Sequence, residues 1–470
     1  MVAPSKLWQV CSCYELCHTW NTSCVGATLD VAKASYRYSF RTYALFYLVS
    51  TLIFHRGIPN IKKLILDILR STNFLAANAI VFMSSICLFR KMLGRFYTGF
   101  AFVPATFASG VAISMEQKSR RPTLALYMAT LATELICNIL ISRGVVRPIK
   151  YGEVMLFSLS SAVGLYMFRR GNCLKKDSLS NLKMFVGKDE MFDEWGGCVP
   201  ESGRYEEVWA DRAARQYTQQ PSTLTVIRAK LRKLMLRLNN LPKHNYCFHD
   251  SSCLSYVLKA TVRKFAVGYG IQAVLNLLRA LPKIATRPKL LLMALVRRDN
   301  FNLALFLGLF VGLFRSVSCL LRWLRDTDSP IHGLIAGGVA GTSSIFFRST
   351  TISLYFASKI IESLLIKGQE RGIVPVIPHA ESILYAISTA TVLNAGVYEP
   401  HNIRPAYWSF LLNLTGSYYG KMNRMLIAHL GTGATKLYPD WPVYADASQL
   451  NLIDKDGLCA RSLQPPSQGV

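Results

Sequence analysis

The sequence lacks the motifs of the commonest enzyme classes. The glycine-rich stretch 332–349 has no lysine after its glycines, and a phosphate-binding Walker loop requires Gly-Lys-Ser/Thr at that point. No alternating strand pattern precedes these glycines, which excludes a dinucleotide-binding fingerprint. No Ser-His-Asp, Cys-His or paired-carboxylate arrangement with usable geometry is present. We therefore predict that the chain is not an enzyme and needs no cofactor.

Charged residues, and acidic residues above all, are scarce. Only 17% of the 470 residues are charged, compared with about a quarter in soluble domains. The chain contains 54 Lys and Arg residues and only 27 Asp and Glu residues. The basic residues lie in short loops between apolar segments, for example 90–95, 118–121 and 143–150. This placement favours contact with lipid phosphates over nucleic acid. A basic region followed by an apolar run is missing at the N-terminus, so we expect no cleavable secretory signal.

Apolar runs of nearly membrane-spanning length recur along the chain. They cover 41–54, 74–89, 97–115, 123–141, 154–168, 265–281, 301–324, 331–347, 350–366 and 382–397. A span needs about 20 residues, so the shorter runs are tilted, re-entrant or interfacial. We predict an all-α, polytopic membrane helix bundle with eight to ten spans.

The two halves of the chain resemble each other. At an offset of 228, residues 120–162 and 348–390 share fourteen identities in forty-three positions without a gap. This similarity predicts two internal repeats of about five apolar helices each. An odd number of spans per repeat would place the second copy inverted in the membrane, and four spans would leave the copies parallel.

The pattern predicts five regions. They are an N-terminal cysteine-rich segment (1–40), a first membrane repeat (41–168), a soluble linker (169–264), a second membrane repeat (265–397) and a C-terminal tail (398–470). The linker holds most of the acidic clusters and a basic amphipathic helix at 224–238. That helix either lies in a membrane interface or packs on the protein's own loops.

Small residues at fourfold spacing predict close helix packing. Gly333, Gly337 and Gly341 fall on one face of a helix, a spacing that lets two helix backbones approach inside a bilayer. Gly110, in the first repeat, aligns with Gly338 and belongs to a similar stripe.

Four ionisable residues within apolar segments are candidates for an intramembrane polar site. Glu134 and Glu362 occupy the same position in the two copies, and Lys359 lies one turn before Glu362. Arg315 interrupts another apolar run, and such residues are costly in a membrane. They form either a polar site between the repeats or structural pairs that fix helix register. Leu131 replaces the lysine before Glu134, so the two glutamates should have different surroundings.

Two short segments combine cysteine and histidine. The first contains Cys11, Cys13, Cys17, His18 and Cys24, and the second contains Cys247, His249 and Cys253. Unmodified thiols, disulfides (Cys17–Cys24 or Cys247–Cys253) and a metal site all remain open. Neither segment has the Cys-x2-Cys pairs that mark a zinc site from sequence alone.

Six stretches together resemble the transmembrane protein 135 family. They read CYELCHTWNTSC, FLAANAIVFMSSICLFRKMLGRFY, EQKSRRPTLALYMATLATE, IAGGVAGTSSIFFRSTTISLYFASKIIE, IPHAESILYAISTA and MNRMLIAHLGTGATK. The resemblance runs over nearly the whole chain except 189–222. The family's cysteine-rich element maps onto Cys13, Tyr14, Glu15, His18, Trp20 and Cys24, and Cys11 and Cys17 are additional. The glycine-rich helices are more distantly similar to the mitochondrial inner-membrane translocase superfamily.

The family resemblance implies a multi-pass protein of mitochondrial and peroxisomal membranes, also associated with lipid droplets. It implies a regulatory role in mitochondrial fission, with the dynamin-related fission GTPase as partner, and in peroxisomal and fatty-acid metabolism. It offers no catalytic residues. The duplicated architecture leaves a second class open, a transporter or channel for a lipid-related or anionic metabolite. Membrane lipids are expected partners and nucleic acid is not, and the sequence fixes no oligomeric state.

Overall fold

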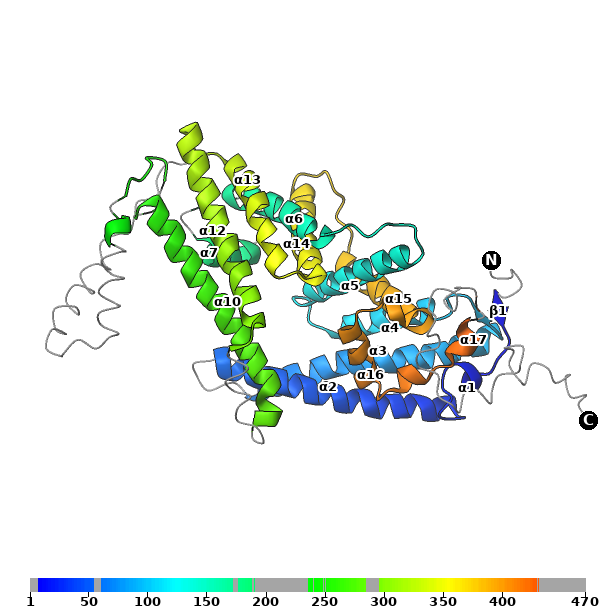
Figure 1. The fold of residues 1–470 in the computed structure, drawn as a ribbon. Coiled ribbons are helices and arrows are strands. Elements are labelled where there is room, and N and C mark those ends of the chain that lie inside the picture. Colours follow the sequence, from blue (N-terminus) through cyan, green and yellow to red (C-terminus); the bar gives the residue numbers. More distant parts are fainter. Residues whose placement is uncertain are drawn as a thin grey trace, which may run out of the picture. The chain divides into compact units, whose positions relative to one another are not determined.

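The computed structural model describes residues 7–54, 61–171, 176–187, 190, 236–239, 241–247, 249, 251–284, 296–428 and 430. The chain forms two compact units. Unit 1 combines residues 1–148 with 377–470, and unit 2 comprises residues 149–376. The prediction of an all-α architecture is confirmed, because the described residues are almost entirely helical (Figure 1).

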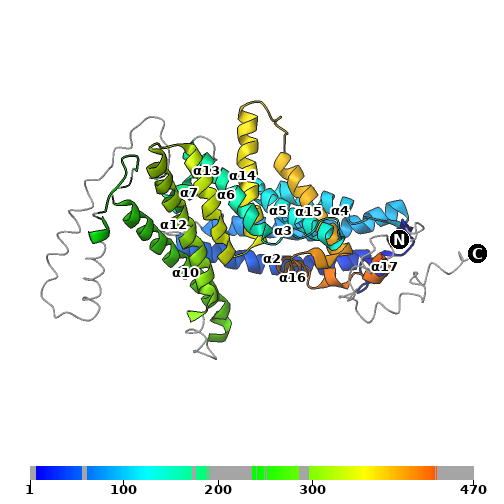
Figure 2. The ribbon, with the colours of Figure 1, turned by 45° about the horizontal axis from the view of Figure 1, so that its top comes forward.

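Unit 1 is built from helices of both halves of the chain. Its elements are β1 (Trp8–Gln9), α1 (Cys13–Leu16), α2 (Cys24–Phe54), α3 (Ile61–Leu93), β2 (Phe96–Tyr97), α4 (Phe102–Met115), α5 (Arg121–Ser142), α15 (Ala380–Tyr398), η3 (Pro400–Asn402), α16 (Pro405–Leu414), η4 (Tyr418–Lys421) and α17 (Arg424–Ala428). The short strands β1 and β2 pair antiparallel. Helix α3 lies between α2 and α4, and α15 packs on both α4 and α5 (Figures 1 and 2).

Alanines spaced three and four residues apart explain how closely α4 packs. Ala101, Ala105, Ala108 and Ala112 are completely buried, because successive turns of a helix bring such residues to one face. Side chains this small let α3 and α15 approach the α4 backbone.

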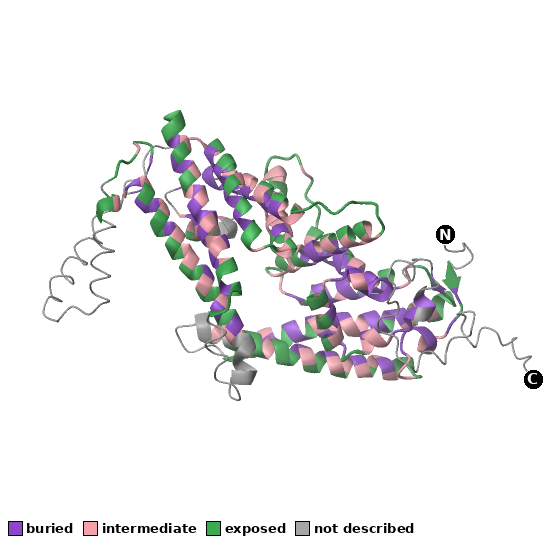
Figure 3. Ribbon diagram, in the orientation of Figure 1, coloured by how far each residue is buried: buried purple, intermediate pink, exposed green. Residues whose placement is uncertain are grey.

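Unit 2 also takes helices from both halves. Its elements are α6 (Gly152–Arg169), α7 (Lys176–Val186), α10 (Cys253–Ile284), α12 (Asp299–Arg325), α13 (Pro330–Gly341), η2 (Thr342–Phe346) and α14 (Thr350–Glu370). Helix α10 lies along α12, and α6 packs on α13 and α14 (Figures 1 and 2). Phe157, Phe306 and Phe310 meet in its core, with ring centroids 5.4–6.3 Å apart. Buried residues follow one stripe of each helix (Figure 3).

Three described helices are long and apolar enough to cross a membrane, namely α3, α5 and α12. The expected eight to ten spans exceed this number. Helices α4 and α13 have 14 and 12 residues, and at a rise of about 1.5 Å per residue they reach only about 21 and 18 Å. The hydrocarbon core of a bilayer is about 30 Å thick, so these two do not span it alone.

Several helix boundaries differ from the regions expected from sequence. Helices α2 and α10 begin at Cys24 and Cys253, well before the apolar runs at 41 and 265, because charged residues interrupt the apolar pattern of their first turns. Residues beyond 398 include α16, whose Trp408 and Leu411 are buried in the core of unit 1. Most of the amphipathic segment 224–238, residues 224–235, lies outside the described residues, as does nearly all of the acidic linker.

Candidate metal centres

Three cysteines and one histidine converge in unit 1, in what we name cluster 1: Cys13, His18, Cys24 and Cys87. Their sulfur and ring-nitrogen atoms all lie within 4.8 Å of one another. Cys13 is on α1, His18 is in the following loop, and Cys24 is the first residue of α2. Cys87 reaches the same place from α3, six residues before the end of that helix.

Local hydrogen bonds fix the segment that carries cluster 1. Ser12 and Glu15 form a capping box at the start of α1, which holds Cys13 on a defined turn. Arg90, on α3, donates from Nε to the carbonyl oxygen of Cys11 over 2.7 Å. The N-terminal loop is therefore attached to the end of α3, where Cys87 lies.

The His18 ring is oriented by its surroundings. Its Nδ1 donates to the carbonyl oxygen of Asn21 over 2.7 Å, and the side chain is completely buried. Its Nε2 is buried and has no hydrogen-bond partner among the described residues. A nitrogen in this state is suited to bind a metal, because the other nitrogen carries the proton.

The cysteines of this segment differ in acidity. The pKa of Cys13 is lowered to about 5, chiefly by a hydrogen bond from Cys87, which outweighs the raising effect of burial, and His18 lowers it further. Burial raises the pKa of Cys17 well above its usual value. The Cys13 thiolate is thus stabilised at neutral pH and Cys17 stays a thiol.

Unit 2 contains a second group of the same composition, which we name cluster 2: Cys247, His249, Cys253 and Cys319. Their ligand atoms also lie within 4.8 Å of one another. The sulfurs of Cys247 and Cys253 are 3.8 Å apart, and His249 Nε2 is 3.6 Å from the Cys319 sulfur. Cys253 is the first residue of α10, and Cys319 lies six residues before the end of α12.

The environment of cluster 2 repeats that of cluster 1 and is more buried. His249 Nδ1 donates to the carbonyl oxygen of Ser251 over 2.5 Å, and the ring stacks on Tyr256 at 4.2 Å. The Tyr256 hydroxyl donates to Glu190. The pKa of Cys247 is lowered to about 3, chiefly by a hydrogen bond from Cys319, against burial. Nearby positive charge on Arg322 lowers it further.

Both clusters offer a donor set that suits one tetrahedral metal ion. Three thiolates and one imidazole are typical ligands of zinc. Four protein ligands leave no open position for substrate, so an ion held there would have a structural role. All nine cysteines that the structure describes are free thiols.

The sequence analysis found most of these residues and missed two. Cys13, His18 and Cys24 come together, as do Cys247, His249 and Cys253, whereas Cys17 lies in the apolar core of unit 1. The two missed residues, Cys87 and Cys319, lie inside apolar helices. A signal exists at an offset of 232, where the segments FMSSICLFRK and FRSVSCLLRW share Phe, Ser, Cys, Leu and Arg.

The two predicted intramembrane glutamates lie in different units. Glu134, on α5, forms an ion pair with Arg404, which donates to both carboxylate oxygens from the turn before α16. Sequence analysis missed this partner, since 270 positions separate the two residues. Glu134 therefore points into unit 1.

The polar residues of the second copy form local contacts. Lys359 and Glu362 pair at 2.8 Å one turn apart on α14, and both are partly exposed. Arg315 donates to the carbonyl oxygen of Val186 over 2.6 Å and lies 3.9 Å from the centre of the Tyr256 ring. These contacts of Lys359, Glu362 and Arg315 all lie within unit 2.

The glycine face of α13 packs on α6. A Cβ atom added at Gly333 would lie 2.7 Å from the Leu165 carbonyl oxygen, and one at Gly337 would lie 2.6 Å from the Ser161 carbonyl oxygen. A Cβ atom at Gly341 would meet the Ser158 backbone. Only glycine permits this approach. Gly110 differs, because a Cβ there would meet nothing within 4 Å among the described residues.

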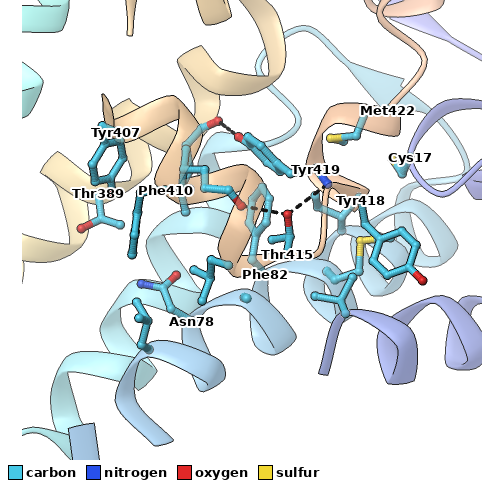
Figure 4. A pocket seen from close by; sticks show the side chains of 18 of the residues that line it. Cys17, Asn78, Phe82, Thr389, Tyr407, Phe410, Thr415, Tyr418, Tyr419 and Met422 are labelled. Atoms are coloured by element: carbon cyan, nitrogen blue, oxygen red, sulfur yellow. Dashed lines mark hydrogen bonds between the residues drawn. The ribbon is translucent and has the colours of Figure 1, made fainter. Parts of the chain in front are cut away.

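Unit 1 encloses an apolar cavity of about 70 Å³ (Figure 4). Aromatic and aliphatic side chains line it, and Trp20 stacks on Tyr418 with centroids 4.6 Å apart. Asn78, Thr389, Thr415 and the tyrosine hydroxyls contribute the polar groups. Tyr407 lines this cavity and also a smaller one that contains Glu134 and Arg404.

These features define a mostly helical protein with candidate membrane-spanning helices and a cysteine-rich N-terminal element. Residues 10–141 match the family described as the N-terminal cysteine-rich region of Transmembrane protein 135. The match supports the transmembrane protein 135 family, which the sequence motifs indicated. The matched region contains all four residues of cluster 1. No solved structure matches the chain.

Proposed function

We propose that the chain is a multi-pass protein of mitochondrial and peroxisomal membranes that regulates mitochondrial fission and peroxisomal and fatty-acid metabolism, and that it also associates with lipid droplets. The observation that carries this proposal is the family match over residues 10–141. The membrane location is supported by the three helices α3, α5 and α12. The dynamin-related fission GTPase is the proposed partner.

Exposed apolar side chains agree with a lipid environment. On α4, Val103 and Phe107 are more than half exposed, and Ile136 on α5 is also exposed. Apolar side chains of this size on the outside of a helix favour contact with lipid. Lys118 and Arg147 are exposed in the loops and are available to lipid phosphates, whereas Arg143 pairs with Glu399 inside unit 1.

We also propose that the two units derive from a duplicated five-helix repeat whose copies exchange their fifth helices. The helices α5 and α14, and likewise α6 and α15, have nearly the same bounds when shifted by 228 residues. The turns between them agree as well. Gly144 and Gly372 share a φ of 71°, and Tyr151 and His379 have φ of 63° and 58°. Helix α15 packs with α4 and α5, and α6 packs with α13 and α14.

An engineered disulfide tests the exchanged helix. A Cβ at Gly338 lies 3.7 Å from the Ala162 Cβ, within the range of about 3.5–4.5 Å that a disulfide needs. The pair Ala162→Cys with Gly338→Cys should cross-link under mild oxidation, as detected by peptide mapping. The control pair Ala162→Cys with Val339→Cys places the second thiol on an exposed position of α13 and should not. Absence of the first cross-link would contradict the exchange.

A transporter or channel for a lipid-related or anionic metabolite is the second candidate. The apolar cavity beside the Glu134–Arg404 pair favours it, because such a neighbourhood suits an apolar tail and an anionic head. We rank the regulatory function first because it rests on the family match over residues 10–141.

Two measurements separate the candidates. Removing the chain from cells should lengthen mitochondria and reduce the fission GTPase bound to them, and wild-type re-expression should restore both. Purified chain in vesicles should move no fatty acid or small organic anion. The transporter would replace the regulatory proposal if two results were found together. Mitochondria would have normal length without the chain, and the vesicles would show transport that Glu134→Gln abolishes at normal protein level.

A further inference from the structure

We propose that the chain binds two zinc ions, one in each unit, through the three cysteines and one histidine of cluster 1 and of cluster 2. This inference does not depend on the proposed function. It rests on the geometry of the two clusters, on the orientation of their histidines and on the place that they occupy in two helix pairs.

The interatomic distances match those around a tetrahedral zinc ion. With zinc–sulfur bonds of about 2.3 Å and a zinc–nitrogen bond of about 2.05 Å, tetrahedral angles place two sulfurs about 3.8 Å apart and sulfur and nitrogen about 3.6 Å apart. In cluster 2 the Cys247 and Cys253 sulfurs are 3.8 Å apart. His249 Nε2 is 3.6 Å from the Cys319 sulfur. One ion would need little rearrangement to bind all four atoms.

Both histidines have the second-shell contact of a zinc ligand. His18 and His249 each donate from Nδ1 to a backbone carbonyl oxygen a few residues further along the chain. This bond fixes the tautomer and leaves Nε2 as the ligand atom. The Nε2 of His18 is buried without a hydrogen-bond partner among the described residues, a state that costs free energy unless another group binds it.

The two clusters occupy the same place in two helix pairs. In each, one cysteine begins the first helix, and another lies six residues before the end of the second, on α3 or α12. The other cysteine and the histidine precede the first helix. Both units therefore present the same four donor types at corresponding places of a helix pair, which is the arrangement expected if both copies of the proposed duplicated repeat hold one ion.

Other uses of these thiols fit less well. A disulfide would join sulfurs about 2.05 Å apart and leave a third cysteine and a histidine of each cluster without a role. A two-iron cluster would distribute its ligands over two iron atoms and require wider spacing than 4.8 Å. A single zinc ion uses all four side chains.

Zinc at these positions would fasten a loop to both helices of a pair. In unit 1, the ion would join the turn of Cys13 and His18 to the start of α2 and to the end of α3 through Cys24 and Cys87. In unit 2, it would do the same for α10 and α12. Such a link stabilises the folded pair, because the unfolded chain does not present a preformed site.

The test is the zinc content of the purified full-length chain in detergent with a thiol reductant. Elemental mass spectrometry should find two zinc ions per chain, one per cluster. Cys24→Ser and Cys253→Ser should each lower the content to one, and the double variant to none. Cys24 is exposed and Cys253 half-buried, so serine disturbs the packing little. Cys137→Ser removes an exposed cysteine outside both clusters and should keep two.

A titration with cobalt keeps the inference testable if a variant fails to fold. Cobalt added to the metal-stripped wild-type chain should saturate at two equivalents, with visible bands of tetrahedral cobalt and intense thiolate charge-transfer absorption. Each of three results would overturn the inference. They are a wild-type chain that contains no zinc although it was produced with ample zinc, a zinc content of Cys24→Ser equal to that of wild type, and iron bound in place of zinc.

Discussion

Replacing Gly337 by alanine introduces one methyl group at the contact between α13 and α6. The new Cβ would lie 2.6 Å from the Ser161 carbonyl oxygen and 3.0 Å from the Ala162 Cα. Ordinary contact begins at 3.4 Å, so the helices must separate by 3.4 − 2.6, about 0.8 Å. Both obstacles are backbone atoms, which cannot rotate away.

The expected loss of stability follows from two opposing effects. Overpacking of this kind costs up to about 3 kcal/mol, and alanine regains about 1 kcal/mol of helix propensity, which leaves about 2 kcal/mol. For a unit of this size, each kcal/mol shifts the melting temperature by about 2–4 °C, so Gly337→Ala should melt about 4–8 °C below wild type. Circular dichroism of the purified chain in detergent measures this shift.

Gly338→Ala is the matched control. It lies on the same helix, and its Cβ would be in ordinary contact with Ala162 at 3.7 Å. It should keep the gain of about 1 kcal/mol in helix propensity and melt at or slightly above wild type. If Gly337→Ala melts as high as Gly338→Ala, the close contact of α13 and α6 does not exist as described.

Three further predictions concern buried charge and metal. Arg404→Met leaves Glu134 without its partner and should lower the stability of the fold by about 1–3 kcal/mol. Lys359→Met breaks a partly exposed pair with Glu362 and should lower it by about 0.5 kcal/mol. Equal losses of stability in thermal unfolding would contradict this difference. Arg322→Met removes a buried guanidinium that pairs with Glu190 and Asp328, and it should destabilise the fold by about 3–5 kcal/mol. The control Arg325→Met, on an exposed residue, should cost less than about 0.5 kcal/mol. A chelator strong enough to strip zinc should lower the melting temperature of the wild-type chain and leave the double serine variant unchanged, and a wild type insensitive to it would argue against a structural ion.

Apolar length predicted the helices of the central segments closely. The runs 123–141 and 301–324 correspond to α5 (Arg121–Ser142) and α12 (Asp299–Arg325). In both, the apolar run extends over nearly the whole helix, so it ends close to where the helix ends. The first turns of α2 and α10 escaped this criterion, because charged residues such as Asp30, Lys33 and Lys259 interrupt their apolar runs.

The packing of α6 on α13 and α14, and of α15 on α4 and α5, could not be read from local pattern. Which helix covers which core depends on contacts between residues far apart in sequence, and hydropathy carries no information on partners. The same limit hid the Glu134–Arg404 pair and the two helical ligands. Cys87 and Cys319 resemble ordinary core residues, since cysteine is among the most often buried residue types.

The most direct test of the paired zinc centres is X-ray absorption at the zinc edge of the purified wild-type chain. The account predicts a first shell of three sulfurs at about 2.3 Å and one nitrogen at about 2.0–2.1 Å, averaged over two equivalent sites. A shell of nitrogen and oxygen alone, or a sample without a zinc edge, would contradict it.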